Sequence, residues 1–256
     1  MSDSESQAQP AGPEAVVVEV TVSAPAGVVW QMLRDPVQIR RWHGWEYEGL
    51  DEEIRQIFID APRVSEADRT LDTGDGRFEL EERGEQTVVR VLRAGAAGAA
   101  SGEGVHDPIN EGWLTFVTQL RFALERQPGR DRDTVYLAGR ARDPGAGSLV
   151  EQLGLGAVAQ LAEGERYYAA TTTGDSLTGT VWLRSERQLG LTVDRWGEGL
   201  LMLSDTGPAD PEPGSSGAIL TVFVPDEQSR EVLAERWSQW WAEHYEPAEG
   251  SRPSAE

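Results

Sequence analysis

Cysteine and lysine are both absent from this sequence of 256 residues. Without cysteine the chain cannot form disulfides, thiolate metal sites or a thiol nucleophile, and nothing in its composition indicates an oxidising compartment. Without lysine it cannot form the Schiff base of a lysine-dependent enzyme or supply the lysine of a P-loop. No serine occurs in the pattern of a nucleophile elbow, so covalent catalysis has few candidate residues.

Long apolar runs and basic residues are also scarce. No segment approaches 18 consecutive apolar residues, so we expect no membrane span. Lys and Arg together number 23 against 44 Asp and Glu, which gives a net charge of −21. A protein this acidic repels polyanions, so we expect neither nucleic acid nor a membrane surface as a partner. Residues 1–15 lack the basic start and apolar stretch of a signal peptide, which favours a disordered tail and a cytoplasmic protein.

Histidine is rare too, and its spacing argues against a metal site. His43, His106 and His244 lie far apart, with no HxH or HExxH pattern, so we expect no metal ion and no cofactor. The acidic run at 51–53 is interpreted as a solvated charge cluster. His43 lies between two tryptophans and is either a base or ligand-orienting group, or a half-exposed histidine that ends a helix. His244 is interpreted as a core histidine bonded to the backbone.

The first half of the chain has the pattern of one compact unit over residues 16–128. Alternating valines predict a strand that ends near Ser23. Two proline-initiated helices follow, the first over residues 25–34 and the second from Pro36 to Trp42. Glycine turns then favour an antiparallel meander with extended segments at 54–59, 69–72, 77–82 and 87–92. We expect a mobile loop at 94–104 and, after it, a long helix with an apolar stripe of Trp113, Phe116, Val117, Leu120 and Leu124.

This order of elements resembles the START/SRPBCC superfamily. The resemblance rests on SAPAGVVWQMLRDPVQIRRW at 23–42 and EGWLTFVTQLRFALE at 111–125, which are most similar to the branch named after the Hsp90 ATPase activator homologue. It covers about residues 16–126 and implies a helix-grip fold, in which a curved antiparallel β-sheet wraps around a long C-terminal helix with an apolar cavity between them. About five strands are visible, fewer than the family usually has, which leaves the size of that cavity open. These are packing motifs, so they concern the fold more than the activity.

The second half repeats the same order about 120 residues later, over residues 132–247, which predicts an α+β protein of two tandem helix-grip copies. The alternative is one large domain with an elaborated C-terminal half. We expect the linker at 127–132 to cross few buried contacts, and residues 248–256 to form a second disordered tail. The expected elements are strands at 134–138, 167–173, 177–184, 190–195, 200–203 and 218–224, a helical stripe at 150–161 after Pro144, and a closing helix that begins at Asp226 and carries Leu233, Trp237, Trp240, Trp241 and His244 on one face.

Nine tryptophans are the last informative feature. Large aromatic side chains usually fill a core, but they also line ligand pockets, and we expect the first copy to keep any pocket that exists. The candidate ligand-binding residues are then Trp30, Trp42, His43, Trp45, Tyr47, Arg55, Trp113, Phe116 and Leu120.

Three functions stay open on this basis. The first is non-catalytic binding of a small hydrophobic molecule, lipid-like or aromatic. The second is a protein-interaction or chaperone-regulating module with a protein partner, which only the family resemblance implies. The third is an enzyme of the cyclase or dehydratase type, for which His43 and Glu46 would be the acid/base pair. The sequence assigns no catalytic residue and does not identify the ligand.

Overall fold

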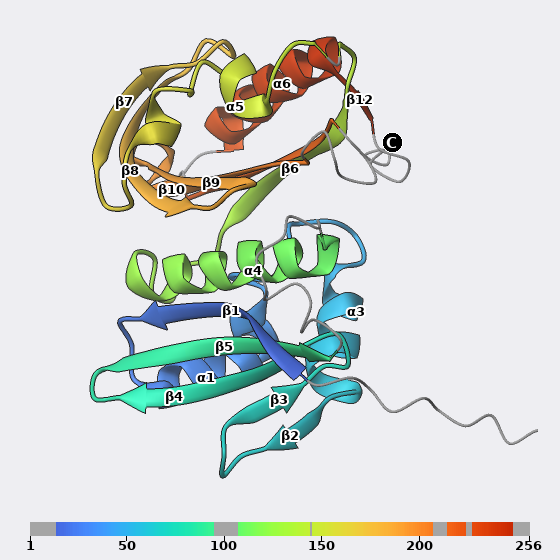
Figure 1. The fold of residues 1–256 in the computed structure, drawn as a ribbon, viewed down its shortest axis with the longest axis vertical. Coiled ribbons are helices and arrows are strands. Elements are labelled where there is room, and N and C mark those ends of the chain that lie inside the picture. The colour runs from blue at the N-terminus through green and yellow to red at the C-terminus, as the bar shows by residue number, and fades with distance from the viewer. Residues whose placement is uncertain (1–13, 95–106, 144, 207–213, 224–226, 248–256) are drawn as a thin grey trace, which may run out of the picture.

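The computed structural model describes residues 14–94, 107–143, 145–206, 214–223 and 227–247. Four layers follow one another along its long axis: a first sheet, helix α4 (Pro108–Glu125), a second sheet and helix α6 (Glu227–His244) (Figure 1). Each antiparallel sheet is thus followed in the chain by a long helix that packs on it. This arrangement confirms the predicted α+β class and the two tandem copies of the helix-grip fold.

The first unit is a five-stranded sheet in the order β1-β5-β4-β3-β2, with three short helices and one π-helical segment before α4. The N-terminal strand pairs along its length with the last strand of the meander and forms one edge of the sheet. The elements are β1 (Glu14–Val22), α1 (Ala26–Arg34), α2 (Pro36–Ile39), α3 (Leu50–Ile54), the π-helix η1 (Arg55–Asp60), β2 (Arg63–Ser65), β3 (Thr70–Asp72), β4 (Arg77–Arg83) and β5 (Gln86–Ala94).

The predicted strand at 54–59 is wrong, because this segment is helical in the structure. Leu50, Ile54 and Phe58 recur every four residues and are all buried, which is the spacing of a helix face. The predicted tail is also two residues too long, since β1 begins at Glu14. The predicted loop at 94–104 lies outside the described residues apart from Ala94, which ends β5.

The second unit is a seven-stranded sheet in the order β12-β6-β11-β10-β9-β8-β7, one strand more than predicted. The helical stripe at 150–161 is not one helix, because Gly154 adopts a φ of 78° after the end of α5. Pro144 and Asp226 lie outside the described residues. The elements before and after α6 are β6 (Asp133–Ala141), α5 (Leu149–Gln152), the 3-10 turns η3 (Val158–Gln160) and η4 (Asp194–Trp196), β7 (Arg166–Ala170), β8 (Ser176–Arg184), β9 (Gln188–Val193), β10 (Gly199–Asp205), β11 (Ser215–Val222) and β12 (Tyr245–Pro247).

Each unit has its own aromatic core between the long helix and the sheet. The first core includes Trp42, Phe58, Phe78, Trp113 and Leu120, all of them buried. The second lies under α6 and includes Trp196, Trp237, Trp240, Trp241 and Tyr245. Side chains therefore occupy the space where the family resemblance implies a ligand cavity.

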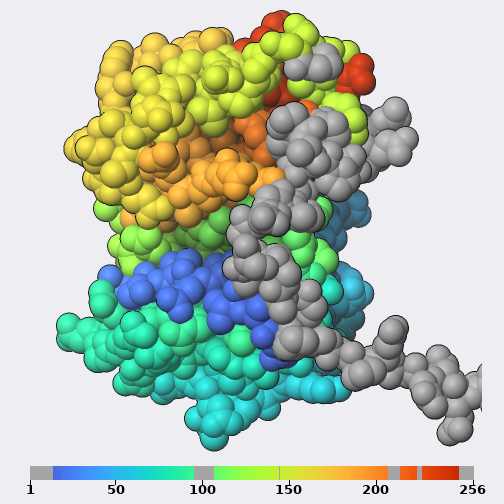
Figure 2. All heavy atoms as spheres, in the orientation of Figure 1, coloured from blue at the N-terminus to red at the C-terminus, as the bar shows by residue number. Residues whose placement is uncertain are grey.

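A third apolar cluster joins the two units. Phe122 of α4 packs edge-on against Trp182 of β8, with 5.6 Å between ring centroids. The guanidinium of Arg121 lies 4.3 Å from the Trp182 ring centroid, a cation–π contact. Every residue of β9 is buried, because α6 covers one face of this sheet and α4 the other. In the space-filling view α4 forms a green band between the two units (Figure 2).

The linker also differs from expectation, since it makes buried contacts between the units. Gln127 is buried, and its side-chain amide donates hydrogen bonds to the carbonyl oxygens of Gly197 and Glu198, 3.0 and 2.8 Å away. Arg132, at the other end of the linker, is buried as well. No helix among the described residues is both long and apolar enough to cross a membrane.

Candidate functional site

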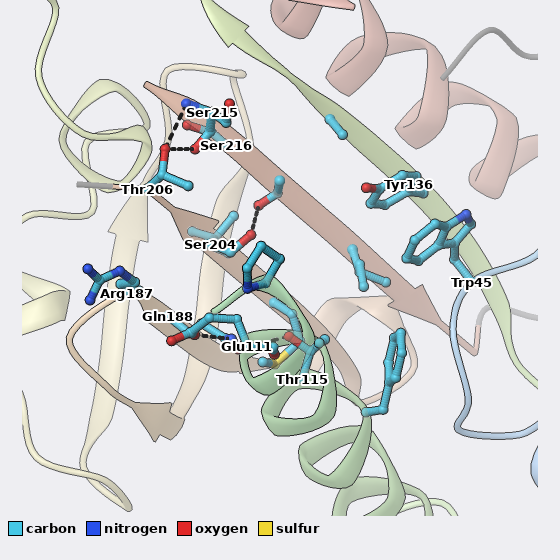
Figure 3. A pocket seen from close by; sticks show the side chains of 18 of the residues that line it. Trp45, Glu111, Thr115, Tyr136, Arg187, Gln188, Ser204, Thr206, Ser215 and Ser216 are labelled. Carbon is cyan, nitrogen blue, oxygen red and sulfur yellow. Dashed lines mark hydrogen bonds between the residues drawn. The ribbon is translucent and has the colours of Figure 1, made fainter. Parts of the chain in front are cut away.

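A pocket of about 990 Å³ lies between the two units. The N-terminal half of α4 forms one wall. The outer face of β6, β10 and β11 forms the opposite wall, and the turn at 43–45 together with η1 borders one end (Figure 3). The pocket is therefore built from both helix-grip copies, whereas the cavity that the family resemblance implies would lie inside one of them.

Small side chains explain why the two walls separate here. Along the outer face of the second sheet, large residues such as Met202 and Ile219 belong to the apolar cluster that includes Phe122 of α4. Towards the pocket the same rows continue with Ala138, Ser204 and Gly217, which stand side by side on β6, β10 and β11. The facing surface of α4 changes in the same way, since Gly112 and Thr115 of this helix line the pocket.

One end of the pocket is aromatic. The indole of Trp45, from the first unit, stacks on the phenol ring of Tyr136, from β6, with 3.6 Å between centroids and 12° between planes. Phe116 and Trp113 of α4 line the same pocket, and their rings are 6.2 Å apart. Flat rings from both units thus offer an apolar surface to a ligand.

The opposite end is polar. Ser204, Thr206 and Ser215 bring hydroxyl groups from the ends of β10 and β11 to this side (Figure 3). Three hydrogen bonds join the walls: Thr115 Oγ1 donates to Gln188 Oε1 at 2.8 Å, and Gln188 Nε2 donates to the carbonyl oxygen of Glu111 at 2.8 Å and to Glu111 Oε2 at 2.6 Å. The pocket therefore combines ring faces with hydrogen-bonding groups, as small-molecule sites do.

His43 borders the pocket and is only 1% exposed. Its Nε2 lies 2.9 Å from Glu53 Oε1, while the Tyr47 hydroxyl donates to the other oxygen of Glu53. Burial lowers the pKa of His43, and the hydrogen bond from His43 lowers the pKa of Glu53. A neutral imidazole therefore faces a carboxylate at pH 7. The carboxylate can only accept, which assigns the proton to Nε2 and leaves Nδ1 as an acceptor.

Nδ1 of His43 is buried and has no hydrogen-bond partner among the described residues. The predicted pairing of His43 with Glu46 is wrong. The backbone N–H of Glu46 donates to Thr134 Oγ1 at 2.6 Å, and its carboxylate pairs with Arg40. Helix α3 brings Glu53 to His43 instead.

Arg132 holds the turn that carries His43. Its guanidinium donates to the carbonyl oxygens of His43 and Gly44, at 2.6 and 3.0 Å, and to Gln119 Oε1 at 2.8 Å. Burial lowers the pKa of Arg132 to about 9, so the group stays charged at pH 7. Because Arg132 belongs to the segment that joins the units, it ties the His43 turn and α4 to the start of β6.

The predicted ligand-binding residues separate into distinct places in the structure. His43, Trp45, Trp113 and Phe116 line the pocket between the units. Tyr47 is 45% exposed, and Arg55 is exposed and pairs with Glu52 and Asp60. The first-unit core contains Trp30, Trp42 and Leu120. A ligand-binding role for any of these residues stays a prediction.

The second unit's share of the lining escaped the sequence analysis. A usable signal is present in the continuous apolar stretches of β9, β10 and β11, which indicate strands that are buried on both faces. Within the described part of the chain, no three His, Asp or Glu side chains come together as metal ligands.

No family model matches the chain, and no curated protein matches it. Among solved structures it is similar to DynU16, a putative protein in the dynemicin biosynthetic locus, with 18% identity over 90% of this chain and 95% of that one and a TM-score of 0.27. It is also similar to the di-domain ARO/CYC proteins BexL, of the BE-7585A pathway, and StfQ, of the steffimycin pathway. Each is 14% identical with a TM-score of 0.30, over 87% and 90% of this chain and 88% and 92% of theirs.

With such low scores, these likenesses add nothing to the helix-grip assignment, which rests on the topology described above. The narrower resemblance to the branch of the Hsp90 ATPase activator homologue stays a prediction.

Proposed function

We propose that the protein binds a small, largely apolar molecule in the pocket between its two helix-grip units. One observation carries the proposal: the rows of large side chains that join the units give way to small ones, and the resulting space has ring faces at one end and hydroxyl groups at the other. Its volume of about 990 Å³ lies at the upper end of the range of roughly 300–1,000 Å³ that is usual for ligand pockets.

The experiment fills the pocket and asks whether binding is lost. Ala138 lies on its β6 wall, so Ala138→Trp should occupy the space, whereas Ala170→Trp places the same side chain on an exposed position of β7. N-phenyl-1-naphthylamine, a neutral apolar dye that fluoresces in apolar surroundings, should bind the wild type and Ala170→Trp at one site per chain. It should not bind Ala138→Trp. Equal binding to all three proteins would contradict the proposal.

Acid/base catalysis on the bound molecule is the second candidate function. The observation that favours it is the His43–Glu53 pair at the pocket, with a neutral imidazole, a carboxylate that holds its Nε2–H, and an Nδ1 that lacks a partner among the described residues. A histidine held by a carboxylate in this way is a common general base. The reaction class would be proton transfer, as in cyclisation or dehydration.

Native mass spectrometry of protein purified from its own host separates binding from catalysis. If the protein is an enzyme, wild type and His43→Gln should retain different molecules, because the variant binds the molecule without converting it. Dehydration lowers the mass by one water, whereas cyclisation alone leaves the mass unchanged, so the retained molecules are also compared by chromatography and fragmentation. The same retained compound in both proteins would exclude catalysis by His43 and leave the binding function in place.

A further inference from the structure

The lining of the pocket carries more negative than positive charge. Five acidic residues and two arginines line it, and burial keeps His43 neutral. Two of the acids count for less, because the Asp205 carboxylate is directed to α5 and the Glu246 carboxylate pairs with Arg142. An anionic ligand would therefore lose its hydration and meet charges of its own sign. The carboxylates belong to Glu53, Asp75, Glu111, Asp205 and Glu246, and the guanidinium groups to Arg140 and Arg187.

Besides Glu53, which accepts from the neutral His43 and from Tyr47, two of these carboxylates are held only by neutral donors among the described residues. Glu111 Oε2 accepts from the side-chain amide of Gln188. Asp205 accepts from the Ser216 hydroxyl at 2.6 Å and from the backbone N–H of Leu149 at 3.0 Å. These bonds fix the carboxylates in place, but they leave the negative charge without a cation. The structure thus holds a preorganised negative site beside an apolar one.

Glu111 is better placed than Asp205 to meet a ligand. It stands in the first turn of α4, in the middle of the pocket wall, and Figure 3 shows it between the hydroxyl-rich end and Thr115. Asp205, by contrast, directs both of its oxygens to the start of α5.

We infer that the pocket selects a ligand that carries an amine beside its apolar body, with Glu111 as the partner of the ammonium group. This inference rests on the proposed binding function and adds the charge of the ligand to it. A charge-assisted hydrogen bond to Glu111 favours the cation, while the rings of Trp45, Tyr136 and Phe116 at the other end contact the apolar body. A neutral relative of the same shape gains only the second contribution.

Three fluorescent probes of one shape test the inference: 1-pyrenemethylamine, 1-pyrenemethanol and 1-pyrenecarboxylate. Energy transfer from the tryptophans to pyrene reports their binding. The wild type should bind the amine at least about tenfold more tightly than the alcohol, the ratio expected from one charged hydrogen bond, and the carboxylate most weakly. The measurements are made at 0.15 M and 0.5 M salt, because salt screens the attraction of a cation to the acidic surface as a whole.

Two variants locate the selectivity. Glu111→Gln keeps an oxygen that can accept from Gln188 and removes the charge, so it should weaken the amine about tenfold and leave the alcohol unchanged. Glu235→Gln removes the same charge from an exposed position on α6 and should change neither. Thermal unfolding confirms that both variants are folded. If Glu111→Gln does not fold, Glu111→Asp replaces it, since the retained charge should preserve the preference for the amine.

The outcomes separate this inference from the proposed function. If the amine and the alcohol bind equally, or if Glu235→Gln weakens the amine as much as Glu111→Gln does, the inference is wrong while the binding function stands. If none of the three probes binds, the proposed function itself fails.

Discussion

Replacing Trp237 by alanine should cost more free energy of unfolding than replacing Trp113, its counterpart on the other long helix. Trp237 is 0% exposed and lies edge-on to Trp196, with 6.0 Å between centroids. Its indole N–H donates to Asp175 Oδ2 at 2.8 Å, and Asp175 is itself only 3% exposed. The truncation leaves a cavity, which costs about 3–5 kcal/mol for a buried tryptophan. It also removes a donor from a buried carboxylate, which adds about 1–3 kcal/mol.

Replacing Trp113 by alanine should cost less free energy of unfolding, because Trp113 borders the pocket and is not packed on all sides. It is 5% exposed, packs edge-on against Phe78 with 5.1 Å between centroids, and lines the pocket beside Phe116. Its indole N–H has no hydrogen-bond partner among the described residues, so no acceptor is left unpaired. Fewer atoms lose contacts on truncation, and we expect a loss of about 2–3 kcal/mol.

Urea unfolding followed by far-ultraviolet circular dichroism measures both losses without relying on tryptophan fluorescence. Phenylalanine variants are the matched controls, since they keep a ring and remove only the N–H. Trp237→Phe should still lose about 1–3 kcal/mol through Asp175, while Trp113→Phe should lose under about 1 kcal/mol. Equal losses for the two alanine variants would refute the view that Trp113 borders an open pocket and Trp237 a filled core.

Three further predictions follow from the site and the charge. Because burial lowers the pKa of His43 below 6.5, the unfolded chain takes up its proton first as the pH falls. Stability should therefore decrease below pH 6.5, and less steeply in His43→Gln, as shown by urea midpoints against pH. Arg132→Met leaves buried acceptors unpaired and should cost about 3–5 kcal/mol in thermal or urea unfolding. With a net charge of −21, the protein should not shift duplex DNA in a gel at physiological salt.

Elements whose signal is local in the sequence were predicted well. The extended segments at 77–82 and 87–92 correspond to β4 and β5, and the stripe from Trp113 to Leu124 lies within α4. Turn glycines delimit the strands and the spacing of the apolar residues indicates the helix, so local patterns were enough to determine the type of element. The segment at 54–59 failed because its short apolar run is compatible with either a strand or a helix, and only the buried residues Leu50 and Phe58 distinguish them.

That error also hid the partner of His43. If residues 54–59 formed a strand, the acidic run before them would be an exposed turn, and Glu46 would be the carboxylate nearest in sequence. In the structure α3 continues into η1, and one turn of this helix carries Glu53 back to His43. The identity of an acid/base pair thus depended on the type of one short element.

The pocket could not be predicted from either half of the sequence alone, because the two long helices pack differently: α4 is buried on two faces and α6 on one. Most outward-facing residues of α6 are exposed, so this helix covers only the inner face of its own sheet. Helix α4 buries Val117 and Leu120 in its own unit and turns Phe122 towards the second sheet. The side chains on this second buried face become smaller towards Gly112 and Thr115, where the second sheet also presents small side chains.

Helix α4 is buried on two faces and so holds the two copies together. The pocket lies where the side chains on its second face become small. The proposed ligand site is consequently a property of the pair of units, and a single helix-grip copy separated from its partner would lack one wall of it.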